Sequence, residues 1–158
     1  MIRPDKIISG GQTGADQAGL DAAIALGIPH GGSCPLGRRS ENGPIPLKYS
    51  LQETQSDYYR DRTTRNVQDS NGTVVFIDGS IDKEPGSALT LNLCKMDERP
   101  NLLINFSLDS IENAAKLLRE FVRHFEIKIL NVAGSRASAS PRIGEKVFQT
   151  IKLAFSEE

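Results

Sequence analysis

Short apolar runs of strand length alternate with segments of helical periodicity along this chain. Such runs occur at residues 6–9, 73–78, 101–106 and 128–132, with a weaker run at 30–34. Four of the five show little polar alternation, which is typical of strands covered on both faces. The pattern therefore predicts an α/β fold with a parallel sheet of about five strands and helices on both faces.

Two of the predicted helices have a clear apolar face. The first covers residues 111–125, and Asp109 with Glu112 forms its predicted capping box. The last helix is expected to start at Ser140 and Pro141, because an N-cap residue is followed there by a proline in the first turn. The residues expected to pack that helix on the sheet are Ile143, Val147, Ile151 and Ala154.

A third predicted helix, at residues 57–70, differs from the others because it has few apolar side chains to bury. Tyr59, Arg62, Thr63 and Asn66 fall on one face at helical spacing. Two interpretations of this face are possible. In one it lines a binding site, and in the other the helix is a solvent-facing edge helix with ion pairs. The pattern itself does not favour either interpretation.

Composition and charge restrict the partners of the chain. Its 158 residues, with 38% hydrophobic and 25% charged, are typical of a single globular domain, which we expect to span residues 1–158. A net charge of -1 provides no overall attraction to nucleic acid or to an acidic membrane, so neither is expected as a partner. The chain has no signal-peptide pattern and no bilayer-spanning stretch, which predicts a cytoplasmic protein. Cys34 and Cys94 lack metal-ligand spacing and are expected to be free thiols.

The turn after the first strand is rich in glycine and reads SGGQTGAD at residues 9–16. Glycines let backbone N–H groups approach a ligand, and the N-terminus of a helix favours an anion. The spacing is that of neither a dinucleotide fingerprint nor a P-loop. The alternative is a capping box of Thr13 and Asp16 with no ligand. If the turn is the site, a bulkier residue at Gly11 or Gly14 should weaken binding more than folding.

Two further loops, at residues 78–87 and 133–140, also join a strand to a helix. The second supplies serine hydroxyls together with Arg136, whose planar guanidinium suits an oxyanion, although an ordinary Ser/Ala-rich loop is equally consistent with the sequence. The carboxyl ends of parallel strands lie at one edge of a sheet, so the three loops are expected to meet in one crevice at the switch point. Arg38 can offer a further cation there, whereas Cys34 is expected to be a small buried residue rather than a nucleophile.

Several motifs occur in order along nearly the whole chain: GGQTGAD, CPLGRRSENGPIP, RTTRNVQDSNGTVVF, DGS with PGSALT, and LNVAGSRAS. This set resembles the molybdenum carrier, or molybdenum cofactor carrier, family. That family is similar to other members of the Rossmann-like SLOG superfamily, which includes lysine-decarboxylase-like nucleotide hydrolases and DNA-processing proteins. The resemblance implies a Rossmann-like doubly wound sheet.

By the same resemblance, the ligand is the molybdenum cofactor (molybdopterin), a pterin that bears a phosphate and a dithiolene-bound oxo-molybdenum. A homo-oligomer is also implied, with a molybdoenzyme or a cofactor-synthesis protein as partner. The phosphate and oxo-metal ends are both anionic and suit loops that offer N–H groups and arginines. The residues expected to bind this ligand are Gly10, Gly11, Gln12, Thr13, Gly14, Asp16, Arg38, Gly86, Ser87, Gly134, Ser135, Arg136 and Ser138. No catalytic or metal-ligating residue is expected.

The hydrolase branch of the superfamily carries a PGGxGTxxE motif whose glutamate acts in cleaving nucleoside monophosphates. The matching stretch here begins at Pro85, and the glutamate position is Leu93. The resemblance therefore favours binding and carriage of an anionic cofactor without catalysis. Two alternatives stay open: a nucleotide-binding, phosphoribohydrolase-like enzyme, and a nucleotide-sensing or interaction module.

Overall fold

The computed structural model describes residues 2–156, and a parallel sheet forms the centre of this part of the chain. Within it, five strands lie in the order β2-β1-β9-β7-β8. These are β1 (Lys6–Ile8), β2 (His30–Gly31), β7 (Gly72–Ile77), β8 (Asn101–Asn105) and β9 (Ile129–Gly134). The predicted α/β fold is confirmed, and the four strong strand predictions agree with the structure to within two residues.

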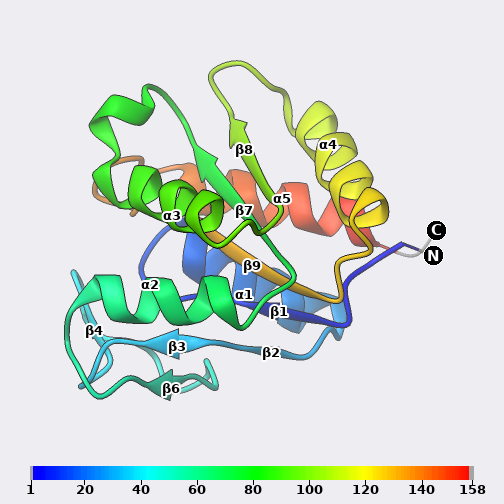
Figure 1. Ribbon diagram of the computed structural model, residues 1–158. Coiled ribbons are helices and arrows are strands. Elements are labelled where there is room, and N and C mark those ends of the chain that lie inside the picture. Colours follow the sequence, from blue (N-terminus) through cyan, green and yellow to red (C-terminus); the bar gives the residue numbers. More distant parts are fainter. Residues whose placement is uncertain (1, 157–158) are drawn as a thin grey trace.

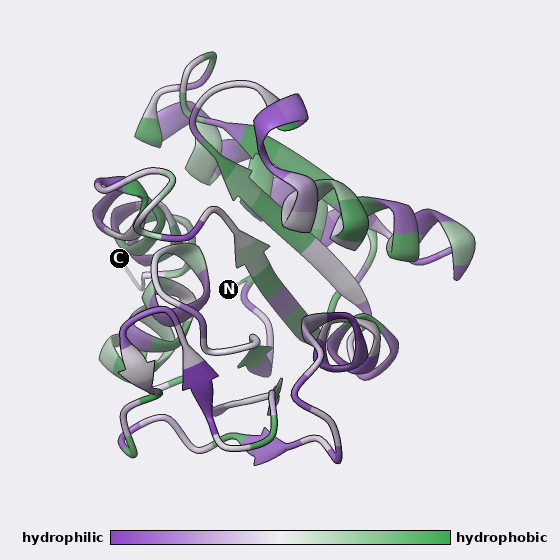
Figure 2. Cartoon of the chain, turned by 90° about the vertical axis from the view of Figure 1, so that its left-hand side faces the viewer, coloured by the Kyte–Doolittle hydropathy of each residue, from purple (hydrophilic) through white to green (hydrophobic). Residues whose placement is uncertain are grey.

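Helices cover both faces of the sheet (Figure 1). On one face lie α1 (Ala15–Leu26), α4 (Ile111–His124) and α5 (Ile143–Phe155), and on the other lie α2 (Tyr59–Gln68), α3 (Pro85–Met96) and the short 3-10 helix η1 (Ile81–Lys83). The long strands at the centre of the sheet are largely hydrophobic in Figure 2, whereas the short strands outside this sheet are mostly hydrophilic. Within residues 2–156, no helix is long and apolar enough to cross a bilayer.

The main core lies on the side of α1, α4 and α5. Side chains such as Phe76, Leu130 and Phe155 are completely buried there. A smaller cluster lies on the opposite face, where Leu91 of α3 packs on Val75 of β7. The α2 helix contributes only Val67 to a third small cluster.

The strand order is that of a doubly wound Rossmann sheet, 3-2-1-4-5, when β9 is counted as the first strand. The β9–α5 unit would open such a fold, but here it follows all the other strands in the chain. The fold is therefore a circular permutation of the Rossmann order. Its switch point, where the strand order reverses, lies between β9 and β7, which pair directly.

The weak strand expected at residues 30–34 is interrupted at Gly32. The chain continues as β3 (Ser33–Cys34), which pairs with β6 (Gln52–Glu53) outside the main sheet. Gly32 has a φ of 127°, and a Cβ atom there would lie 2.1 Å from the carbonyl oxygen of Ser9. Glycine therefore allows the chain to turn away at a point of close contact with β1.

Between β3 and β6, the chain forms a small antiparallel hairpin. Its strands are β4 (Arg39–Ser40) and β5 (Gly43–Pro44), and Glu41 and Asn42 form the tip. We refer to residues 39–44 as the rim hairpin.

The predicted capping box of α4 is wrong. The N-cap is Ser110, whose hydroxyl accepts a hydrogen bond from the N–H of Asn113 at 3.1 Å. Asp109 instead accepts from the side chain of Asn113 at 2.7 Å. Both residues are competent caps, and the chain direction at the start of the helix selects the serine.

The predicted start of α5 is also wrong, although its buried face is correct. The helix begins at Ile143, and Arg142 is the N-cap without a side-chain capping bond. The chain at Ser140 is held in a turn by its N–H, which donates to the carbonyl of Arg136. The four predicted packing residues, Ile143, Val147, Ile151 and Ala154, are all buried.

Two helical glycines provide a matched test of this packing. A Cβ atom at Gly19 of α1 would lie 2.8 Å from the Cβ of Val132, whereas at Gly144 of α5 the nearest atom would be 3.6 Å away. We expect Gly19→Ala to lower the free energy of unfolding by about 1–3 kcal/mol, because the core is already filled. Gly144→Ala should raise it by about 0.5 kcal/mol, because alanine restricts the unfolded chain. Urea unfolding measures both values, and equal effects would contradict the close contact between α1 and β9.

Candidate functional site

A cavity of about 320 Å³ opens at the carboxyl ends of β9 and β7, beside the switch point. Its walls come from the turn after β1, from α2, from the start of α3 and from the loop after β9. The three loops that were expected to meet therefore do so. Small-molecule sites of doubly wound folds occur at this position.

Eight of the thirteen predicted ligand-binding residues line this cavity. They are Gln12, Asp16, Gly86, Ser87, Gly134, Ser135, Arg136 and Ser138. The residues that lie outside its lining are Gly10, Gly11, Thr13, Gly14 and Arg38.

Three N–H groups of the glycine-rich turn, those of Gly11, Gln12 and Ala15, are bonded to the protein itself. The N–H of Gln12 donates to the carboxylate of Asp16 at 3.2 Å, and that of Ala15 donates to the carbonyl of Ser135 at 3.0 Å. No side chain caps α1, so the alternative capping box with Thr13 is absent as well. The turn therefore packs against the loop after β9, and these three amides are already bonded within the protein.

Gly11 and Gly14 are required by the conformation of this turn. Both have positive φ values, 75° and 80°. A Cβ atom at Gly14 would lie 2.4 Å from the carbonyl oxygen of Ser135, and one at Gly11 would lie 2.5 Å from a methyl group of Leu51. Bulkier residues at these positions would therefore disturb the fold, so substitutions here cannot separate an effect on binding from an effect on folding.

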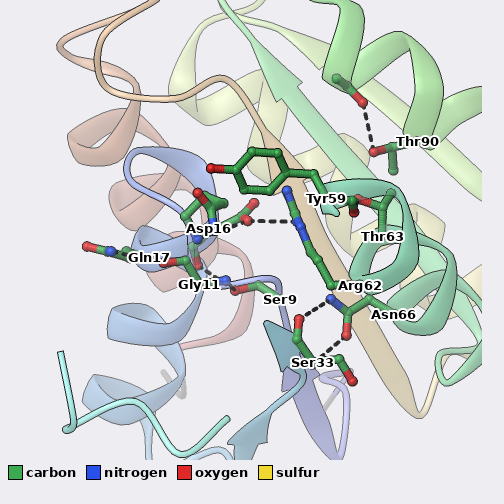
Figure 3. Close-up of polar contacts among 12 residues, drawn as sticks. Ser9, Gly11, Asp16, Gln17, Ser33, Tyr59, Arg62, Thr63, Asn66 and Thr90 are labelled. Carbon is green, nitrogen blue, oxygen red and sulfur yellow. Dashed lines mark hydrogen bonds and ion pairs between the residues drawn. The ribbon is translucent and has the colours of Figure 1, made fainter. Parts of the chain in front are cut away.

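A buried ion pair joins α2 to α1 at the cavity wall (Figure 3). Nη1 of Arg62 lies 3.3 Å from Oδ2 of Asp16, and the two side chains are 13% and 5% exposed. Gly10 leaves room for the guanidinium, since a Cβ atom there would be 2.0 Å from Nη1. Burial raises the pKa of Asp16, and the charge of Arg62 opposes this rise. Burial lowers the pKa of Arg62, and Asp16 opposes that change in turn.

Two buried polar atoms in this wall have no hydrogen-bond partner within residues 2–156: Nε of Arg62 and Oε1 of Gln12. The amide nitrogen of Gln12 donates to the carbonyl of Arg39 at 2.9 Å, which leaves the amide oxygen as the free acceptor. Buried polar groups are nearly always bonded. A ligand that reached these two atoms would satisfy them with one acceptor and one donor.

Tyr59 presents an aromatic surface at the same wall. Tyr59 is 37% exposed, and the guanidinium carbon of Arg136 lies 4.5 Å from its ring centroid. The guanidinium carbon of Arg62 lies 5.6 Å from it. A phenol ring beside a guanidinium plane is suited to stacking with a flat heterocycle.

The helix that offers its N-terminus to the cavity is α3. The first amides of a helix have no partner within it, and no side chain caps α3. Gly86 and Ser87, in its first turn, line the cavity, and a Cβ atom at Gly86 would meet nothing within 4 Å. The partial positive charge of this helix end favours an anion.

Charged side chains add a positive excess to the cavity. Lys83, Arg62 and Arg136 line it, together with the carboxylates of Asp16 and Glu84. Because Asp16 is already paired with Arg62, the remaining cations and the α3 end favour a negatively charged ligand.

Arg38 has a structural role in the loop that carries the rim hairpin. Its guanidinium donates to the carbonyls of Ile45, Pro46 and Tyr49 at 2.8–3.1 Å. These bonds hold the side chain at the base of the rim hairpin and away from the cavity lining.

Leu93, at the position of the hydrolase glutamate, is buried between α2 and α3. It packs with Val67 and Cys94 and does not line the cavity. Cys94 and Cys34 are both buried, and burial raises the pKa of each thiol. The expectation that Cys34 is a small buried residue is confirmed.

Several residues that line the cavity were not among the ligand-binding residues predicted from the sequence. Tyr59, Arg62 and Thr63 belong to the polar face of α2, whose helical spacing did indicate a possible site, and in the structure this face lines the cavity. The others are Lys83, Glu84, Pro85, Leu89, Thr90, Ala133 and Ala139. Among the described residues, no three His, Cys, Asp or Glu side chains gather in a way that can hold a metal ion.

The fold and the cavity together define a Rossmann-like ligand-binding protein. The chain belongs to the circularly permutated YpsA SLOG family, whose model matches residues 7–155. The name of the family agrees with the permuted strand order described above.

The chain is also similar to a solved structure, that of a "putative molybdenum carrier protein" from Syntrophus aciditrophicus SB. The two are 41% identical with a TM-score of 0.93, over 97% of this chain and 96% of the other. The resemblance drawn from the sequence motifs is thus confirmed. No curated protein is significantly similar to this chain.

The buried ion pair predicts that single and double substitutions will not be additive. Arg62→Met leaves the buried Asp16 carboxylate without its ion-pair partner, and we expect it to lower the free energy of unfolding by about 3–5 kcal/mol. Combining it with Asp16→Asn removes both charges, so the double variant should be more stable than Arg62→Met alone by at least about 1 kcal/mol. Urea unfolding at neutral pH measures these values. Simple addition of the two single losses would show that the pair is not coupled.

Proposed function

We propose that this protein binds and carries the molybdenum cofactor, or a closely similar phosphate-bearing pterin, in the cavity at the switch point. The observation that carries the proposal is the pairing of an aromatic–guanidinium surface with the N-terminus of α3 across one cavity. The first suits a flat heterocycle and the second suits an anion. The name of the Syntrophus protein points to the same class of cargo.

Each part of a pterin phosphate has a counterpart in the cavity. In this proposal the ring stacks beside Tyr59, and the free amide oxygen of Gln12 accepts a hydrogen bond from a ring N–H. The phosphate lies at the first turn of α3, near Ser87, and Arg136 adds a cation. The molybdenum keeps the sulfur ligands of its own pterin, so the cargo needs no metal ligand from the protein.

Cleavage of nucleoside monophosphates is the second candidate function. It draws on the carboxylates of Asp16 and Glu84, which lie in the same cavity and can in principle exchange protons with a ligand. Asp16 is paired with Arg62, however, and the hydroxyl of Ser135 donates to Glu84. With Leu93 in place of the motif glutamate, we favour carriage. The proposal also includes a cytoplasmic location for the protein and a homo-oligomeric state. It further includes exchange of the cofactor with a molybdoenzyme or a cofactor-synthesis protein.

An anaerobic titration with isolated molybdenum cofactor tests the proposal. We expect saturable binding at micromolar concentration, slower oxidation of the bound cofactor, and no release of base from adenosine 5′-monophosphate. The opposite result, with no cofactor binding while the nucleotide is bound or cleaved, would support the hydrolase instead.

Gly86→Leu tests where the cofactor binds. Because a side chain at this position extends into open space, we expect the fold to keep its stability within about 0.5 kcal/mol. Leucine would fill part of the cavity, and cofactor affinity should fall about tenfold or more through lost contacts. Asn92→Leu is the matched control, since Asn92 is an exposed residue of the same helix that does not line the cavity. Equal affinity in the two variants would place the cofactor elsewhere.

A further inference from the structure

At the rim of the cavity, a carboxylate of the chain itself accepts several hydrogen bonds. Glu41, at the tip of the rim hairpin, accepts from the hydroxyl of Thr13 at 2.5 Å and from the hydroxyl of Ser138 at 2.6 Å. The N–H of Ser138 is a third donor, at 3.2 Å. Ser138 also lines the cavity, so these donors lie next to the space assigned to the cofactor.

The donors are oriented before any anion arrives. Oγ1 of Thr13 accepts a hydrogen bond from the N–H of Ala137 at 3.2 Å, which directs its own proton toward Glu41. Thr13 is only 6% exposed, so its side chain is held in place by packing. Two loops that lie far apart in the sequence thus direct three donors at one pair of oxygens. This geometry is that of an oxyanion site.

The Glu41 carboxylate can leave without unfolding the rim hairpin. The hairpin is fixed at its base by the Arg38 bonds and by the amide of Gln12, which donates to the carbonyl of Arg39. Glu41 itself is exposed, and hydrogen bonds to an exposed group exchange readily with bonds to water. The same bonds hold the pKa of Glu41 below its usual value, so the group is an anion at neutral pH.

We propose that Thr13 and Ser138 form an oxyanion subsite that receives a phosphate group, and that Glu41 occupies this subsite as an internal competitor. The proposal deepens the proposed function, because it assigns a second anchoring point beside the α3 end. A ligand phosphate displaces the Glu41 carboxylate and takes over its three hydrogen bonds. Glu41 then determines how readily anions enter from this side of the cavity.

Titration with inorganic phosphate tests the subsite without any cofactor. Binding is followed through the amide resonance of residue 138 in the intact protein and in Glu41→Gln. An internal competitor multiplies the apparent affinity by the fraction of time that the site is free. If Glu41 leaves the site free about one tenth of the time, Glu41→Gln should bind phosphate about tenfold more tightly. Glu53→Gln is the matched control, because Glu53 is an exposed glutamate that accepts from the N–H of Gly37 at 2.6 Å away from the cavity. It should leave phosphate affinity unchanged.

Adding Ser138→Ala to Glu41→Gln should abolish most of the gain, since it removes one donor and keeps the resonance that is measured. Thermal unfolding of each variant confirms that the fold is retained. Unchanged or weaker phosphate binding in Glu41→Gln would overturn the proposal, and so would a gain that persists without the Ser138 hydroxyl. If phosphate behaves as expected but the molybdenum cofactor does not bind, the proposed function fails and the subsite stands.

Discussion

The buried pair of Asp16 and Arg62 is the interaction on which the arrangement of the site depends. The α2 helix has too few apolar residues to hold itself on the sheet, and Val67 is its one fully buried hydrophobic side chain among the described residues. Polar contacts replace them: the ion pair at one end and, at the other, two hydrogen bonds between Asn66 and the backbone of Ser33. A helix held in this way can present polar side chains to a cavity, which an apolar helix could not do.

The sheet was predictable because hydrophobic periodicity reports burial directly. The strands of the main sheet and the packing face of α5 follow from that pattern alone. Details set by distant neighbours did not follow. The break at Gly32 depends on the carbonyl of Ser9, and the choice of Ser110 over Asp109 as a helix cap depends on the path of the chain into α4.

The candidate site, like the fold, was only partly predictable from the sequence. That three loops would meet follows from the parallel strand directions, and the structure brings them together. Which helix end is open could not be read from the residues, because it depends on contacts across the fold. The turn before α1 has the richer glycine pattern, yet Asp16 and Ser135 accept two of its N–H groups. Arg38 and Arg62 are equally cationic in the sequence, and only the second reaches the cavity.

The permuted strand order has a consequence for folding during synthesis. Because β9 lies between β1 and β7, both of those strands have an open edge until residues 129–134 have left the ribosome. The loop with Ser135 and Arg136 emerges at the same late stage, so the cavity cannot exist on a shorter nascent chain. Open edges invite pairing with other chains. Chaperone capture of this protein should therefore be concentrated in the interval before its central strand is inserted, and ligand can have no influence on folding until that interval is over.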